Sequence, residues 1–255
     1  MNNRQGETTY NKQGCLMEII EYNNTDDITV MFQDEYKTKV HTSYRHFKEG
    51  NVKNPYYSSV LGVGVIGIKY LSSIKHKTIK EYTIWKAVLT RCFDDKYKNK
   101  KPTYKDVTCC EEWLLFENFY EWLHSQKNFN RWYNADGWAL DKDILVKGNK
   151  VYSPETCCLV PQSVNALFLK RNLIKNNLPV GVSKKDKGYI AQCQNPFTNK
   201  NEYLGYRYTP EETFLLYKIY KEELIKQVAQ IEYNNGNITK RCYEAMMNYE
   251  VEITD

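Results

Sequence analysis

The sequence has no long uninterrupted apolar run. A helix that spans a membrane needs about 18 or more consecutive apolar residues, whereas the longest apolar stretch, residues 58–72, is broken by glycines. The first residues also lack the apolar core of a signal peptide. These absences favour a cytoplasmic protein without a membrane partner.

Zinc-ligand spacing is missing as well. The chain has 8 cysteines, but none forms a Cys-x-x-Cys pair. The adjacent pairs Cys109–Cys110 and Cys157–Cys158 would point to opposite sides of a strand, and no histidine lies at ligand spacing from them. The sequence therefore favours reduced, mostly buried thiols over a zinc site.

Charge is unevenly distributed along a chain with a net charge of +5. Residues 69–105 contain eleven Lys/Arg and three acids, residues 170–210 contain eight and two, and residues 106–145 contain three bases and eight acids. Two basic blocks around an acidic one suit a protein that binds phosphates at its ends and a cation in the middle. The alternative is a lysine-rich composition with solvated charged faces.

The first part of the chain alternates like strands. Residues 16–22, 28–32 and 36–40 mix apolar and polar residues in a strand-like alternation and are separated by polar turn residues. This pattern predicts a small β module. The glycine-punctuated segment 58–72 that follows is expected to run along a core or a groove.

Three capping-box patterns predict helix starts. They are Thr78 to Glu81, Thr108 to Glu111, and Thr209 to Glu212, the last with a proline at the first helical position. Apolar residues recur at helical spacing after each of them. The third helix is expected to be about six turns long.

Residues 138–168 predict a strand, a tight turn at Gly148-Asn149, a second strand and a short helix. Residues 178–182, 189–194 and 203–208 predict three further strands ahead of the third helix. The sequence thus predicts a modular α+β chain, with these parts: a small N-terminal β module (1–57), a linker (58–77), a helical segment with a ββα-metal finger (78–172), a three-stranded sheet plus helix (173–232), and a C-terminal tail (233–255).

The finger region resembles the phage HNH (His-Me finger) homing endonucleases. The matching residues are Leu140-Asp141-Lys142, Gly148-Asn149, and Tyr152-Ser153-Pro154-Glu155-Thr156-Cys157, in the family's order. The resemblance implies Asp141 and Asn165 as ligands of one Mg²⁺ (or Mn²⁺) ion, which prefers oxygen donors. Asp143 is an additional candidate ligand, because it shares a strand face with Asp141.

The residue expected to accept the proton is missing. Lys142 stands where this family has its general-base histidine, and Thr156 stands where an asparagine orients that histidine. A positioned base contributes roughly 10²–10⁴ in rate, and a lysine between two carboxylates favours its charged form. Lys142 is therefore expected to contact phosphate, in a catalytic set with Asp141 and Asn165. The alternative is that residues 141–143 form an ordinary surface ion-pair strand.

Residues 178–230 resemble the ethylene-response-factor type of DNA-binding domain. The residues that carry this resemblance are Gly181-Val182, Tyr189-Ile190-Ala191, Leu204-Gly205, and Thr209 to Glu212. The family lays its sheet in the major groove of duplex DNA, where polar side chains read base edges and lysines contact phosphates. The implied DNA-binding residues are Lys184, Lys185, Lys187, Tyr189, Gln192, Gln194, Tyr206 and Arg207. The alternative is that half of these tyrosines and lysines pack on the helix or are only solvated.

Together these resemblances imply a metal-dependent DNA endonuclease of phage homing type, which cleaves duplex DNA at a site recognised by its flanking modules. The first alternative is a regulatory DNA-binding protein on a catalytically degenerate HNH scaffold. The second is a phage adaptor that inhibits a host protein. Such a protein would act in the host cytoplasm, and nothing in the sequence implies an oligomer.

Overall fold

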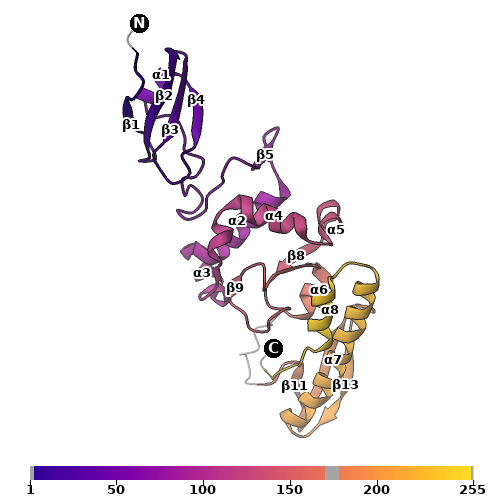
Figure 1. Ribbon diagram of the computed structural model, residues 1–255. Coiled ribbons are helices and arrows are strands. Elements are labelled where there is room, and N and C mark those ends of the chain that lie inside the picture. Colours follow the sequence, from indigo (N-terminus) through magenta and orange to yellow (C-terminus); the bar gives the residue numbers. More distant parts are fainter. Residues whose placement is uncertain (1–2, 170–177, 254) are drawn as a thin grey trace. The chain divides into compact units, whose positions relative to one another are not determined.

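The computed structural model describes residues 3–169, 178–253 and 255 (Figure 1). It divides into two compact units, Met1–Lys105 with Cys109–Glu121, and Asp106–Thr108 with Trp122–Asp255. Both contain helices and small sheets, which confirms the modular α+β class. None of the helices among the described residues is long and apolar enough to cross a membrane.

The first unit begins with a four-stranded antiparallel sheet in the order β1-β2-β3-β4. Its elements are β1 (Thr8–Tyr10), β2 (Leu16–Asn24), β3 (Asp27–Phe32), β4 (Lys39–Thr42) and the short helix α1 (Tyr44–Lys48). Alternate residues of β2 and β3 are buried against Phe47 and Val52, as the alternation predicts. The predicted third strand begins later than expected, because Asp34 accepts hydrogen bonds from the backbone nitrogens of Tyr36 and Lys37 and holds them in a turn.

The segment 58–72 lies against the helices of the same unit. Val65 exchanges backbone hydrogen bonds with Leu114 and Phe116, and a Cβ added to Gly64 would overlap the side chain of Leu89. The expectation that this segment runs along a core is confirmed. The neighbouring elements are β5 (Ser73–Ile74), β6 (Lys77–Thr78), α2 (Lys80–Phe93), α3 (Asp95–Lys100), the 3₁₀ turns η1 (Pro102–Tyr104) and η2 (Glu111–Leu114), and α4 (Phe116–Ser125).

Two of the predicted helix caps are wrong. Thr78 lies in the β5–β6 hairpin, and α2 begins after Ile79, which makes no side-chain capping bond. Thr108 lies in β7 (Thr108–Cys109), where its nitrogen donates to the carbonyl oxygen of Lys150. Each threonine lies in a strand that pairs with another segment. A capping pattern of four neighbouring residues does not reveal such pairing. The third cap is confirmed, since the Thr209 hydroxyl accepts from the nitrogen of Glu212.

The second unit contains the predicted ββα order in an altered form. Strand β8 (Trp138–Asp141) pairs antiparallel with β10 (Cys158–Pro161), and α6 (Gln162–Leu167) follows directly and packs on both. The expected hairpin across Gly148-Asn149 is wrong. Strand β9 (Val151–Tyr152) pairs with β7 through Thr108, so residues 142–157 form a long loop between the two paired strands.

The C-terminal part of this unit is a three-stranded antiparallel sheet covered on one face by a long helix (Figure 1). The elements are β11 (Val182–Lys185), β12 (Gly188–Asn195), β13 (Lys200–Arg207) and α7 (Pro210–Asn234). The first strand was predicted too early: Gly181 has a φ of +72°, and the nitrogen of Val182 donates to Pro179, which places a turn there.

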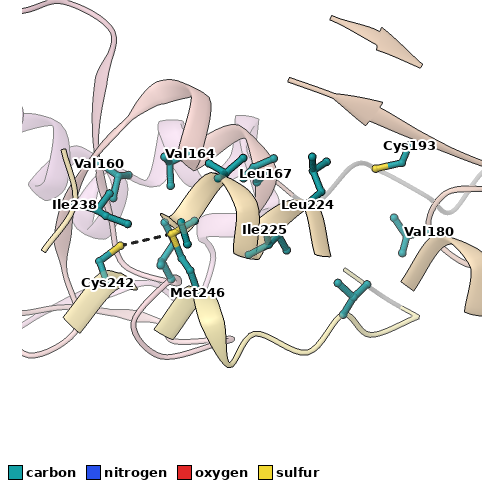
Figure 2. Packing of buried hydrophobic residues seen from close by; sticks show 14 of the residues in the cluster. Val160, Val164, Leu167, Val180, Cys193, Leu224, Ile225, Ile238, Cys242 and Met246 are labelled. Atoms are coloured by element: carbon teal, nitrogen blue, oxygen red, sulfur yellow. Dashed lines mark hydrogen bonds between the residues drawn. The ribbon is translucent and has the colours of Figure 1, made fainter. Parts of the chain in front are cut away.

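One hydrophobic core joins the ββα elements to the C-terminal sheet and helices. Figure 2 shows Val160 and Val164 with Leu224 and Ile225 of α7 and with Cys242 of α8 (Lys240–Met247). Helix α8 lies within the predicted tail, and its Cys242 and Met246 side chains are fully buried. Helix α5 (Phe129–Asn134) follows Asn128, whose amide donates to the carbonyl oxygens of Leu159 and Asn237.

Candidate metal centre and nucleic-acid interface

Asp141 ends strand β8 and shapes the loop that follows. Its Oδ1 atom accepts hydrogen bonds of 2.7 Å from the backbone nitrogens of both Asp143 and Ile144. The side chain is nearly buried, and burial raises the pKa of this carboxyl. Its Oδ2 atom takes no hydrogen bond from the described residues. Oδ1 therefore holds the turn after β8, whereas Oδ2 has no hydrogen-bond partner among the described residues.

Lys142 is held inside the loop. It is 8% exposed, and its Nζ donates to Asp143 Oδ1 at 2.7 Å and to the carbonyl oxygen of Asn149 at 2.9 Å. The Asn149 amide returns a bond of 2.8 Å to the carbonyl oxygen of Lys142. The structure thus directs the Asp143 carboxylate to an ammonium group and gives Lys142 a role in closing the loop.

Asn165 lies on α6, the helix that packs on the strand carrying Asp141. Its neighbours Val164 and Leu167 are buried in the core, whereas Asn165 is half-buried. Its side chain makes no hydrogen bond within the part of the chain that the structure describes. An amide and a carboxylate oxygen are donors that suit Mg²⁺, which keeps several water ligands.

No cluster of three or more His, Cys, Asp or Glu side chains at metal-binding distance occurs among the described residues. An ion bound through Asp141 or Asn165 would therefore take most of its ligands from water and phosphate oxygens. The Asp141 carboxylate and the Asn165 amide suit a weakly held Mg²⁺ or Mn²⁺ ion, because both offer hard oxygen ligands.

The loop of residues 142–157 contains no histidine. The Thr156 hydroxyl donates to the carbonyl oxygen of Val151 at 2.6 Å. His124 is the one histidine in the sequence of the second unit, and its ring packs tilted against that of Phe129 with centroids 3.9 Å apart. All eight cysteines are free thiols, and five of them are buried.

The register of the C-terminal sheet separates its two faces. Ala191 and Cys193 are buried and face α7, so the alternate residues Ile190, Gln192 and Gln194 point to the opposite, open face. Residues directly opposite on neighbouring strands share a face. The register therefore places these residues on the open face: Ser183, Lys185, Ile190, Gln192, Gln194, Asn201, Tyr203 and Tyr206.

The eight residues predicted to bind DNA are divided by this register. Four of them, Lys185, Gln192, Gln194 and Tyr206, lie on the open face. Lys184, Tyr189 and Arg207 form one cross-strand row on the α7 side, at the end of the sheet, and Lys187 lies in the β11–β12 turn.

Four open-face positions were absent from these eight residues: Ser183, Ile190, Asn201 and Tyr203. Pairing each strand with its neighbour would have identified them, but the register depends on a β-bulge beside Ala191. Tyr206 is also fixed by its surroundings, because a Cβ on Gly188 would lie 2.5 Å from its hydroxyl oxygen.

A scan against protein-family models, a search of curated proteins and a search of solved structures each find no match to this chain.

Proposed function

We propose that this protein binds duplex DNA with the open face of the β11–β12–β13 sheet. The observation that carries the proposal is the set of polar side chains on that face, in particular Gln192 and Gln194, beside the exposed Lys185. Glutamine amides can pair with adenine edges in the major groove, and lysines contact phosphates. The major groove admits a two-stranded β-ribbon, so two neighbouring strands of this sheet fit its width.

The charge of the sheet supports a polyanionic partner. Lys184, Lys185 and Lys187 are exposed around a single tight turn, and no ion pair to any of them occurs in the described ranges. Free lysines on a fixed turn can exchange their counterions for phosphates, which makes binding strongly dependent on salt. Duplex DNA in the cytoplasm of a host cell is the partner we propose.

Binding to a fluorescent duplex of mixed sequence tests this function. Gln192→Ala with Gln194→Ala is expected to weaken binding to a preferred sequence roughly tenfold or more, since each bidentate base contact contributes about 1–3 kcal/mol. Gln227→Ala, an exposed glutamine of α7, is the matched control. Equal affinities for the double variant, the control and the wild type would contradict the assignment of the reading face.

Metal-dependent cleavage of the bound DNA is the second candidate function. It is favoured by the order β8, β10, α6, by the unbonded Oδ2 of Asp141 and by the unpaired amide of Asn165. These two residues would hold a Mg²⁺ or Mn²⁺ ion, which supplies electrostatic stabilisation of the charge on the phosphate. The chain's own contribution is to orient the phosphodiester and to exclude bulk water from the loop. Lys142 contributes no proton transfer, because its ammonium is bonded inside the loop.

Supercoiled plasmid incubated with Mg²⁺ or Mn²⁺ separates the two functions. Nicking by the wild type that is lost in Asp141→Asn and in Asn165→Ala supports cleavage at this centre. Binding without nicking supports a regulatory DNA-binding protein on a degenerate scaffold. Nicking that persists in both variants, with their folds verified by thermal melting, excludes the site.

A further inference from the structure

A second basic surface lies in the first unit, outside the site described above. It consists of α3 and η1, residues 95–105, and contains five lysines. Four of them are exposed and have no ion-pair partner in the described part of the chain: Lys96, Lys100, Lys101 and Lys105. We call these four residues the α3–η1 lysines.

The backbone beneath the α3–η1 lysines is well ordered. The Asp94 carboxylate caps α3 by accepting from the nitrogens of Lys96 and Tyr97. The nitrogen of Lys101 donates to Tyr97, and that of Lys105 donates to Pro102. The lysines are thus presented by a fixed turn, so a polyanion that binds them loses little backbone entropy of the protein.

Aromatic packing fixes the same turn from below. The ring of Tyr104 stands edge-on to Tyr97, with centroids 5.6 Å apart. The guanidinium of Arg91, from α2, lies 5.9 Å from the Tyr104 ring centroid. The turn is therefore attached to the helical core, while its lysines point to solvent.

The α3–η1 lysines repel one another when no anion is bound to them. Lys96 and Lys100 are four residues apart on one helix, where like charges repel each other. Asp95 directly precedes Lys96, and the Asp94 carboxylate accepts from the backbone nitrogens of Lys96 and Tyr97. A row of phosphates would relieve this repulsion and would release bound counterions at the same time.

The surface also lacks the apolar centre of a protein-binding site. Among the residues that the structure describes, no exposed large apolar side chain occurs between Ile74 and Tyr133. Protein interfaces have apolar and aromatic residues at their centre and few lysines, whereas a nucleic-acid backbone requires only cations and hydrogen-bond donors.

We infer that the α3–η1 lysines form a second, sequence-independent phosphate-binding surface, by which the first unit contacts DNA while the sheet of the second unit reads its sequence. The inference rests on the proposed DNA-binding function. It extends that function by giving the chain two separate contacts on one duplex. The contact through the α3–η1 lysines determines much of the salt dependence of binding.

The test is the salt dependence of binding of the full-length protein to a random-sequence duplex. One variant changes the α3–η1 lysines together: Lys96→Gln, Lys100→Gln, Lys101→Gln and Lys105→Gln. The matched control removes the same charge from exposed lysines of the N-terminal module: Lys12→Gln, Lys37→Gln, Lys39→Gln and Lys53→Gln. Because both variants have the same net charge, a general electrostatic effect acts equally on them.

The slope of log K against log salt concentration is expected to fall by about 2–4 in the α3–η1 variant, since each lost phosphate contact removes about 0.9. The control is expected to retain the wild-type slope. Equal slopes for the two variants, each with an unchanged melting temperature, would overturn the inference.

The Gln192→Ala, Gln194→Ala protein, measured in parallel, distinguishes the two proposals. If it loses sequence preference while the α3–η1 variant keeps its slope, only the further inference fails. If the α3–η1 variant loses slope while the sheet variant behaves as wild type, only the reading face fails. A wild-type protein that binds neither duplex DNA nor duplex RNA contradicts both, and binding to duplex RNA alone contradicts the choice of DNA.

Discussion

Lys142 and Asn149 exchange two hydrogen bonds across the loop that connects β8 to β9. The Lys142 ammonium donates to the Asn149 carbonyl at 2.9 Å, and the Asn149 amide donates to the Lys142 carbonyl at 2.8 Å. This pair closes the loop beside Asp141. Lys142 thus holds the loop in shape.

Replacing Lys142 by methionine tests this role. The variant keeps the apolar stem but removes the donor to Asn149 and to Asp143, so the free energy of unfolding is expected to fall by about 1–2 kcal/mol. Urea unfolding measures it. The control is Lys150→Met, which removes an exposed pair with Asp106 of 3.7 Å and is expected to cost about 0.5 kcal/mol or less. Equal losses in the two variants would contradict a structural role for Lys142.

Asp141→Asn and Asp141→Ala are expected to have opposite effects. Asparagine keeps the Oδ1 acceptor for the nitrogens of Asp143 and Ile144 and removes the buried charge, so the variant should be at least as stable as the wild type at neutral pH. Alanine leaves both nitrogens without their acceptor and should lower the free energy of unfolding by about 1–3 kcal/mol. Urea unfolding at pH 7 compares them, and an asparagine variant as unstable as the alanine one would disprove this account.

The pH dependence follows from the direction of the same pKa shift. Burial raises the pKa of Asp141, so the folded state binds a proton more readily than the unfolded state. The stabilising contribution of this group is fully present below the unfolded pKa of about 3.9 and is lost as the pH rises through the folded pKa. The free energy of unfolding of the Asp141→Asn protein should not show this decrease as the pH rises.

Added Mg²⁺ should stabilise the wild type at neutral pH and leave Asp141→Asn unchanged, because a cation at Oδ2 favours the ionised carboxylate that burial disfavours. Thermal melting with and without Mg²⁺ is the measurement. An equal shift in both proteins would show that any bound ion lies elsewhere.

Gly67→Ala should destabilise the first unit. Gly67 has a φ of +81°, and a Cβ there would overlap the carboxylate of Glu117, which accepts 2.6 Å bonds from the nitrogens of Ile68 and Lys69. The expected loss is about 2–4 kcal/mol, from backbone strain and displaced hydrogen bonds. Gly62→Ala is the control, since Gly62 has a φ of +74° and no atom within 4 Å of an added Cβ. Calorimetric unfolding should show a clearly larger loss for Gly67→Ala.

The thiols should differ in reactivity. Burial raises the pKa of Cys157 to about 12, whereas the hydrogen bond with the Cys109 thiol lowers the pKa of the half-exposed Cys110. Since the thiolate is the reactive form, iodoacetamide at pH 8 should label Cys110 at least about tenfold faster than Cys157 in the native protein. Mass spectrometry of the digested protein measures both rates. Equal labelling after addition of urea is the control, and equal labelling before it would contradict the buried position of Cys157.

The parts of the fold that the sequence predicts are those stabilised locally. The alternation in residues 16–32 gives β2 and β3, and the Thr209 cap with its proline gives the start of α7. The patterns at Thr78 and Thr108 fail because strand pairing takes both residues, in the second case with Lys150. The partner of β8 is likewise decided by the shared core rather than by the turn at Gly148.

The candidate site is divided in the same way. The residue types at Asp141 and Asn165 are visible in the sequence, because they occur in order within a recognisable pattern. The sequence does not show that Asp141 Oδ1 accepts hydrogen bonds from two backbone nitrogens, because these bonds depend on the conformation of residues 142–144. The sequence predicts either a helical or an extended tail for residues 233–255. It does not separate the two, because Cys242 and Met246 are the only fully buried apolar residues of α8 in a charged segment.

The continuous core of the second unit limits how this chain can be rearranged. Val160, Val164, Ile225 and Cys242 come from four separate elements yet share one packed interior. A gene exchange or an engineered fusion that joins the chain within residues 122–251 would bring unmatched halves of that interior together, and neither half could bury its apolar side chains. Tolerated crossovers should therefore fall before residue 122, so the sheet and the ββα elements are inherited as one piece.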